Sequence, residues 1–353
     1  MLLEVVLKIF LLNHNVYKYV LQFYIESEIM KKEIILLALL ATVSVSGISG
    51  CVQPSQWPFL QVTPTVLGGT GMVITDFIAD PTEVYSNATG RVMMTVKNLG
   101  GALVDMDTSL VMIAGSGIKE TLADGLYWTG SGTTTSVYQH FTKDMKPEDT
   151  VRGTPADEKT FTWNLRSPAD IETGTTRTDV FIGRIYYDYT TTVTGNIWVY
   201  SQTESDAARA AGRELNRATF SSTSGPVALT LRSTPDPVVL ATGENTFTMI
   251  MTISNVGGGA LYETGSVTYT SGSEDVTLTT DELNRVDVTI TSPGLTITGC
   301  SGSQELVGGK DLTLSCDVTV STPPTAFASY QVKFVADYGY NTERTATVTV
   351  SGR

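Results

Sequence analysis

Two segments of the chain show the same alternation of apolar and polar positions. In RVMMTVKN, one face collects Val92, Met94 and Val96. In TFTMIMTISN, one face collects Phe247, Met249, Met251 and Ile253. A period of two with one apolar face is typical of a strand half-buried against a second layer. The pattern returns in TFTWNL, NIWVYS, LTLSCDVTV and TATVTV, so we predict an all-β fold.

Both of the first two strands end in similar glycine-rich segments. One continues as NLGGAL, Asn98 to Leu103, and the other as NVGGGAL, Asn255 to Leu261. Asparagine tolerates left-handed backbone and caps turns with its side chain, and glycine adopts positive φ without strain. Each segment is therefore predicted to be a tight, irregular turn between two strands.

Further landmarks occur in the same order in both halves of the chain. The pairs, with their separations, are Pro81 and Pro237 (156), Asn98 and Asn255 (157), Trp163 and Val318 (155), and Asp188-Tyr189 and Asp337-Tyr338 (149). This near-constant spacing indicates an internal duplication, with chance likeness between Thr-rich strands as the alternative. Many short strands in units of about 125 residues predict two tandem β-sandwiches.

A helical stretch separates the two halves. ESDAARAAGRELNR is rich in good helix formers, and Ser205 or Asp206 can cap its start. ATFSSTSGP follows as a linker. We therefore place one sandwich at 72–202, a helical linker at 203–225 and a second sandwich at 226–353.

The N-terminal region has the layout of a secretory leader. Lys31 and Lys32 precede an apolar core from Ile34 to Val45, which is shorter than the roughly 20 residues that span a bilayer. We interpret 30–50 as a signal peptide that starts at Met30, and 1–29 as an upstream extension. The Pro- and Gly-rich segment 51–71 is predicted to be a tether.

The end of the leader, Ile48-Ser49-Gly50-Cys51, resembles the lipobox of bacterial and archaeal lipoproteins. The resemblance covers this signal alone, with Ile and Ser where Leu and Ala are commonest in the family. It implies that Cys51 is lipidated, becomes the first mature residue and attaches the chain to membrane lipid. Two long acyl or isoprenoid chains give stable anchoring, at about 0.8 kcal/mol per buried methylene. The alternative is an ordinary leader, cleaved or uncleaved, with an incidental Cys51.

The turn pattern V-x-N-x-G-G-A in both halves resembles CARDB-like, immunoglobulin-like domains of bacterial and archaeal surface proteins. The motif is short and moderately specific. The resemblance implies adhesion or structural modules outside the cell, often without enzymatic activity. Residues 115–159 depart from a compact module and are predicted to form an extended loop region.

Charge and catalytic residues narrow the class of function. Lys and Arg total 23 against 36 Asp and Glu, a net charge of −13. A phosphate backbone would repel such a chain, so no nucleic-acid partner is expected. His140 is the single histidine after the leader, and no nucleophile motif accompanies it. We therefore expect that the chain is not an enzyme and that it has no catalytic residue and no cofactor.

Two pairs of carboxylates are candidate cation ligands. Asp105 with Asp107, and Glu274 with Asp275, could contribute oxygens to calcium. Neither pair shows the ordered ligand spacing of a known calcium loop. We interpret them as solvated turns and expect no metal site.

Cys300 and Cys316 are predicted to form a disulfide, because an exported chain reaches an oxidising compartment. Cys300 is out of step with the apolar positions Leu295 and Ile297, so a bulge at Gly299 is expected. Two free, buried thiols are the alternative.

Asn87-Ala88-Thr89 is the single N-x-T sequon that meets the spacing rule, and it lies in a predicted turn. Asn87 is therefore a candidate glycosylation site on a surface protein. Such tripeptides also arise by chance.

Aromatic residues provide the candidate ligand contacts. Tyr127 and Trp128 lie in a glycine-flanked loop, where exposed rings could stack on a sugar or anchor a protein. Tyr186, Tyr187 and Tyr189 form a second cluster, for which packing in the core is the preferred interpretation.

These observations predict a lipid-anchored protein on the extracellular face of the membrane. Its expected work is binding or scaffolding, with a glycan or an envelope protein as partner. One alternative is an envelope enzyme, or an accessory subunit, with a site in 115–159. Another is a structural subunit of a surface layer or filament, in which strand addition could use 52–71.

Overall fold

The computed structural model describes residues 69, 71–118, 128–132, 134, 136–267, 276 and 278–353. Contacts divide the chain into two units, Met1–Thr63 and Pro64–Arg353, and every described residue lies in the second unit. The leader, Cys51 and most of the expected tether lie outside the described residues. Within the described part, no helix has the length and hydropathy needed to cross a membrane.

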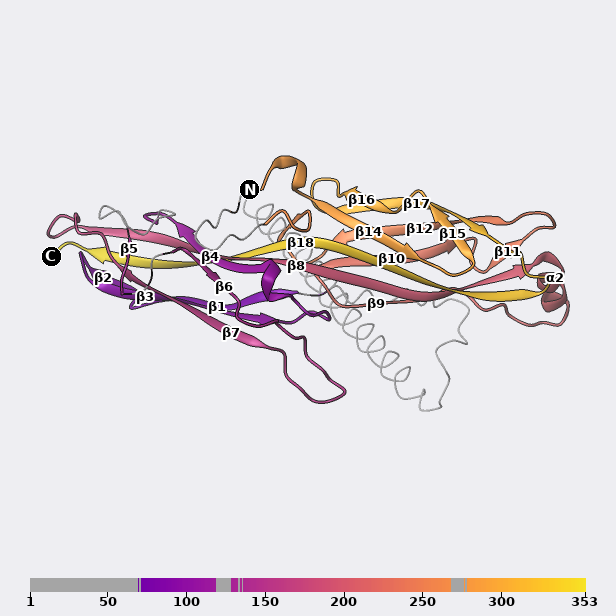
Figure 1. The fold of residues 1–353 in the computed structure, drawn as a ribbon, viewed down its shortest axis with the longest axis horizontal. Coiled ribbons are helices and arrows are strands. Elements are labelled where there is room, and N and C mark those ends of the chain that lie inside the picture. Colours follow the sequence, from indigo (N-terminus) through magenta and orange to yellow (C-terminus); the bar gives the residue numbers. More distant parts are fainter. Residues whose placement is uncertain are drawn as a thin grey trace, which may run out of the picture. The chain divides into compact units, whose positions relative to one another are not determined.

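The described chain is mostly β, as predicted, and forms three sheets with mainly antiparallel pairing (Figure 1). One four-stranded sheet has the order β1 (Met72–Asp80), β3 (Thr89–Asn98), β7 (Glu158–Arg166), β5 (Thr129–Gly130). A second has the order β10 (Val227–Thr234), β12 (Thr246–Asn255), β17 (Asp311–Val320), β15 (Leu295–Thr298).

The third sheet has ten strands and is common to both halves. Its main path is β16 (Gly302–Glu305), β14 (Arg285–Thr291), β18 (Phe327–Ser351), β8 (Thr176–Ser201), β4 (Ser109–Gly115), β6 (Tyr138–His140). Four short strands pair with β8 or β18 off this path: β2 (Glu83–Tyr85), β9 (Thr219–Ser222), β11 (Val238–Leu240), β13 (Ala260–Tyr262). The helical segments are η2 (Met106–Thr108), α2 (Gln202–Ala210) and η3 (Thr280–Glu282).

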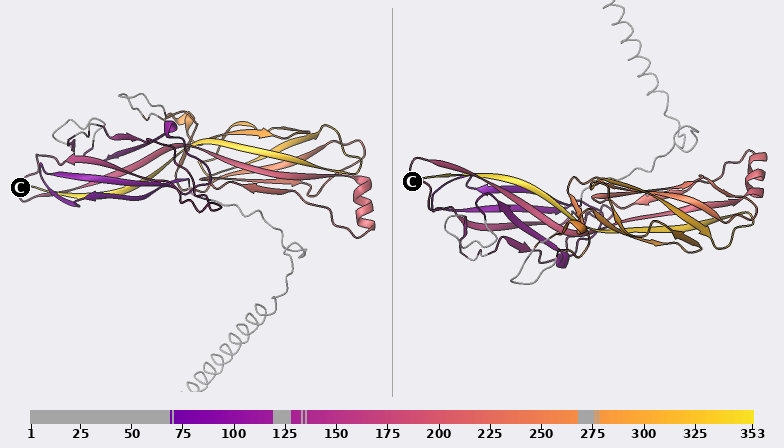
Figure 2. Two further views of the ribbon diagram at one scale, coloured as in Figure 1. Left: turned by 60° about the horizontal axis from the view of Figure 1, so that its bottom comes forward. Right: turned by 90° about the horizontal axis from the view of Figure 1, so that it is seen from above.

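Strands β8 and β18 join the two halves. They pair antiparallel over their whole length, from Thr176 with Ser351 to Tyr200 with Phe327. The first half of β8 pairs with β4, whereas its second half pairs with β9 and β11. Two further views show both strands passing through both sets of strands (Figure 2).

This exchange of strands changes the expected domain organisation. The C-terminal part of β18 pairs with β2 and with the first half of β8, although it lies at the far end of the sequence. Residues 327–353 therefore contribute to both sandwiches. The boundary expected near residue 202 does not separate two independent modules.

Close packing against β8 explains one glycine in the middle of this strand. A Cβ atom on Gly183 would lie 2.8 Å from the ring of Phe77 in β1 and 2.9 Å from Met94 in β3. Such distances are shorter than van der Waals contact. Glycine at this position lets the four-stranded sheet approach the shared sheet closely.

The two asparagine turns have matching hydrogen bonds. The Asn98 side-chain amide donates to the carbonyl of Ala102 at 2.9 Å. The Asn255 amide donates to the carbonyl of Gly259, also at 2.9 Å. Each asparagine thus closes a turn of the same length, which is the role expected from the sequence.

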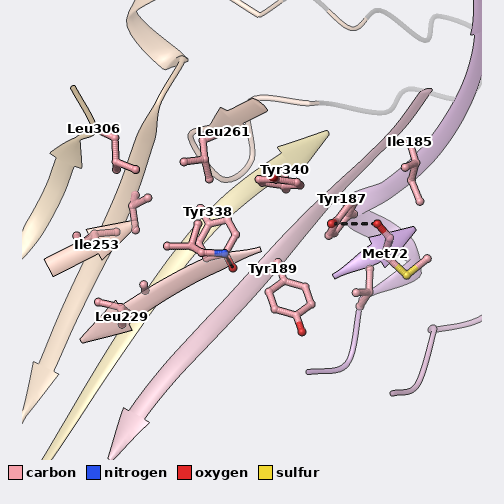
Figure 3. Packing of buried hydrophobic residues seen from close by; sticks show 14 of the residues in the cluster. Met72, Ile185, Tyr187, Tyr189, Leu229, Ile253, Leu261, Leu306, Tyr338 and Tyr340 are labelled. Carbon is pink, nitrogen blue, oxygen red and sulfur yellow. Dashed lines mark hydrogen bonds between the residues drawn. The ribbon is translucent and has the colours of Figure 1, made fainter. Parts of the chain in front are cut away.

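Four buried tyrosines lie where β8 and β18 cross between the halves (Figure 3). The Tyr189 hydroxyl accepts from the backbone N–H of Gly101, and the Tyr340 hydroxyl accepts from the N–H of Gly259. At the start of β1 the Tyr187 hydroxyl donates to the Met72 carbonyl, and at the start of β10 the Tyr338 hydroxyl accepts from the Val227 N–H. By these contacts Tyr189 corresponds to Tyr340. The sequence comparison paired Tyr189 with Tyr338 instead, two positions earlier in the chain. Burial raises the pKa of all four hydroxyls.

Helix α2 is shorter than predicted and begins earlier. Its cap is Ser201, whose hydroxyl accepts from the N–H of Glu204 at 3.2 Å. Ser205, an expected cap, is buried inside the helix. The helix ends at Ala210, and the segment that follows it contains β9.

Candidate functional site

Several of the predicted site residues can be placed in the structure. Cys51 and Tyr127 lie outside the described residues, as do Glu274 and Asp275. His140 is exposed at the end of β6, on an edge of the shared sheet. Tyr186, Tyr187 and Tyr189 are buried, as preferred from the sequence.

Trp128 is buried, with 2% of its surface exposed, so the expectation of an exposed ring is wrong. Its indole N–H donates to the Asp179 carboxylate at 2.8 Å, and its ring meets Phe181 edge to face. Arg177 completes the group with an ion pair to Asp179 at 2.9 Å. An indole held in this way stabilises the first sandwich and offers no face to a ligand.

The predicted disulfide is present. Cys300 and Cys316 are both fully buried, and their Cα atoms are 5.3 Å apart. Gly299 has a φ of 86°, a left-handed conformation that re-aims the chain before Cys300. Strand β15 ends at Thr298 and pairs with β17 without a register shift, so a bend at Gly299 stands in place of the expected bulge.

A pocket of about 520 Å³ opens where β8 and β18 pass between the two halves. Strands β8, β14, β16 and β18 contribute to it, together with the segments that follow β3 and β13. The lining is Leu103, Asp105, Thr108, Asp188, Tyr189, Thr190, Thr264, Asp287, Val288, Thr289, Gly302 and Asp337. None of these residues belongs to 115–159, where an enzyme site was considered.

The pocket is acidic because adjacent strands present aspartates there. Asp287 of β14 lies directly opposite Asp337 of β18 in the strand register, and Asp337 lies opposite Thr190 of β8. The Thr190 hydroxyl donates to Asp337 at 2.5 Å. Like charges directly opposite each other destabilise a sheet. The described lining contains no Lys, Arg or His to offset them.

Asp188 is the most perturbed carboxyl group of the pocket. Burial, together with the negative charges of Asp337 and Asp105, raises its pKa from 3.8 to about 6. A hydrogen bond from the Gly265 backbone N–H acts in the opposite direction. Asp188 is thus close to half protonated in mildly acidic solution.

The chemistry available in the pocket is that of carboxylates and hydroxyls. Across the described residues, no three His, Cys, Asp or Glu side chains are arranged to hold a metal ion. Asp105 also accepts from the N–H of Asp107 at 2.8 Å and thereby caps η2. Sequence patterns single out Asp105 but do not reveal the pocket, because its members come from strands remote in sequence.

We predict that Asp188 makes stability depend on pH. The folded pKa lies above the ordinary value, so the folded state binds the proton more tightly than the unfolded state. This contribution is complete below pH 4 and is lost as the pH rises to about 6. Asp188→Asn keeps an oxygen acceptor for Gly265. It should raise the free energy of unfolding by about 1–2 kcal/mol at pH 7.5, after solvent screening, and change it little at pH 4.

Urea unfolding at the two pH values measures this effect. Asp107→Asn, outside the pocket, is the matched control and should leave the pH profile unchanged. Equal stabilisation by Asp188→Asn at both pH values would contradict the assignment.

The exposed edge of β1 is not a smooth template for strand addition. A bulge interrupts its register between Ile74 and Asp76. The Arg344 guanidinium of β18 donates to the carbonyls of Ile74 and Thr75. Bulges and charged side chains are common ways of protecting an edge from pairing.

Comparisons with known proteins find weak structural similarity to some solved structures and no relative in sequence. No protein-family model matches the chain, and no curated protein matches it. A CARDB domain from Pyrococcus furiosus, solved in complex with di-metal ions, is 18% identical with a TM-score of 0.18, covering 34% of this chain and 76% of that chain. The D0–D1 domain of intimin is 10% identical with a TM-score of 0.17, covering 79% of this chain and 98% of that chain.

The Yersinia pseudotuberculosis adhesin InvE is also 10% identical, with a TM-score of 0.15, covering 78% of this chain and 58% of that chain. All three similarities are weak. They carry no information about a ligand or an activity.

Proposed function

We propose that the mature chain is a lipid-anchored protein on the outer face of the cell membrane. There its tandem immunoglobulin-like sandwiches bind or scaffold other envelope components without catalysing a reaction. The observation that carries this proposal is Cys51, placed directly after an apolar leader and a lipobox-like tetrapeptide. The partners it would take are a glycan or an envelope protein.

One structural feature supports export, and another bears on the length of the tether. The disulfide between Cys300 and Cys316 is the kind of cross-link that persists in oxidising compartments. The folded part also starts soon after the proposed anchor, because the backbone N–H of Leu99 already bonds to the Gly71 carbonyl. A short tether would therefore hold the sandwiches close to the membrane.

We predict that Cys51→Ser abolishes membrane anchoring. The wild-type chain, expressed at full length in a prokaryote with lipoprotein processing, should begin at Cys51 and carry lipid. It should partition into detergent, whereas the variant stays in the aqueous phase because its residue 51 has no thiol to receive the lipid. Mass spectrometry of the N-terminal peptide and detergent phase separation measure both results.

Cys300→Ala with Cys316→Ala is the matched control, since it removes thiols without touching the anchor and should still partition into detergent. A wild-type chain recovered in the cytosol with its leader intact and without lipid would overturn the proposal. The binding role is tested by screening the purified mature chain against glycans and envelope proteins. If the folded chain bound none of them, the result would contradict the proposal that it is a binding module.

A further inference from the structure

The turn between β2 and β3 carries the tripeptide Asn87-Ala88-Thr89. Asn87 is exposed and has a φ of 59°. Its side-chain amide has no hydrogen-bond partner among the described residues, and Thr89 is exposed at the start of β3. The amide and the hydroxyl that define the sequon are therefore both accessible to solvent.

Backbone and hydroxyl contacts hold this turn in place. The Ser167 hydroxyl donates to the Tyr85 carbonyl at 2.6 Å and accepts from the Ala88 N–H at 3.0 Å. The Asn87 backbone N–H donates to the Pro168 carbonyl at 3.0 Å. All these bonds use atoms other than the Asn87 side chain. A group attached to that side chain would extend into solvent without disturbing the turn.

Asn284 provides an internal comparison. It has nearly the same backbone conformation, with a φ of 61°, but the residue two positions later is Val286. A left-handed asparagine is thus compatible with the fold with or without a sequon. The conformation of Asn87 explains why asparagine stands there, but it does not explain the hydroxyl at Thr89.

We propose that Asn87 carries an N-linked glycan, a proposal that rests on the export proposed above. The donor would be an oligosaccharide linked to a lipid through phosphate or pyrophosphate. The Asn87 amide nitrogen attacks the anomeric carbon, a C–N bond forms, and the bond from that carbon to the phosphate oxygen breaks. The nitrogen loses one proton to a base of the transferase, and the lipid phosphate leaves as the anion.

The position gives the glycan a physical role. Strand β2 pairs with β18 in parallel and is followed directly by the modified turn. Tyr85, at the end of β2, is 55% exposed. A hydrophilic chain at Asn87 covers this short edge and its aromatic ring, which lowers the tendency of the edge to pair with another molecule.

Mass spectrometry of the chain purified from its own cells tests the proposal. The peptide that contains Asn87 should carry hexose-type mass increments in most molecules. Thr89→Val should abolish them while leaving Asn87 and its turn in place. Thr89→Ser, which keeps the hydroxyl, should retain them. Asn87→Gln is a second loss variant, with unchanged circular dichroism as the folding control.

The outcomes separate this proposal from the proposed function. An exported, lipidated chain with unmodified Asn87 overturns the glycan alone. A cytosolic chain without processing at Cys51 overturns both. Modification that survives Thr89→Val would also overturn the proposed N-linked glycan, because the sequon would then have no part in the attachment.

Discussion

Ending the chain at Tyr340 is expected to unfold the first sandwich, even though the deleted residues lie at the opposite end of the sequence. Residues 341–351 pair with the first half of β8 and with β2. Val348 and Val350 are almost completely buried. Burial of two valines alone contributes about 3–6 kcal/mol, a large part of the 5–15 kcal/mol that stabilises a typical domain.

Hydrogen exchange measured by mass spectrometry distinguishes this result from the one expected for two modules that fold independently. Peptides from 72–166 should lose protection in the truncated chain. A control chain that ends at Ser351 removes the last two residues and keeps every strand, so its protection should match the full chain. Loss confined to 226–340 would show that the first sandwich does not need β18.

Replacing both Cys300 and Cys316 with alanine is expected to lower the free energy of unfolding by about 3 kcal/mol. The two cysteines are 16 positions apart, and closing such a loop removes conformational entropy from the unfolded chain. The cross-link joins the end of β15 to β17, so its loss frees an edge of the second sheet. The midpoint of thermal unfolding should fall by roughly 6–12 °C.

Calorimetry of the oxidised, the reduced and the double-variant protein measures this change. The reduced wild type is the matched control and should unfold near the double variant. An unfolding midpoint of the double variant equal to that of the oxidised wild type would show that the cross-link contributes nothing to stability.

Local patterns predicted much of the fold. The alternation in TFTMIMTISN marks β12, and LTLSCDVTV lies within β17. The turns after Asn98 and Asn255 follow from residue types that accept unusual backbone conformations and bond to nearby carbonyls. These features depend on neighbours in the sequence, which is why they can be recognised there.

Features that depend on distant residues were not predicted. Strand β8 continues through the turn-type dipeptide Gly195-Asn196, and nothing local states that β8 and β18 each complete two sandwiches. The glycines around Trp128 suggested an exposed loop, whereas the Asp179 carboxylate provides the buried partner that the indole needs. The acidic pocket likewise gathers Asp188, Asp287 and Asp337 from three strands.

The continuous pairing of β8 with β18 also constrains how the gene can change. Side chains of a strand alternate between its faces, so inserting one residue near Asp188 would turn every later side chain of β8 to the wrong face. Tyr189 would then leave the core, together with the apolar positions that follow it. In two separate modules joined by a linker, an insertion in one module leaves the strands of the other unchanged. In this chain an insertion in β8 or β18 would disturb both halves at once.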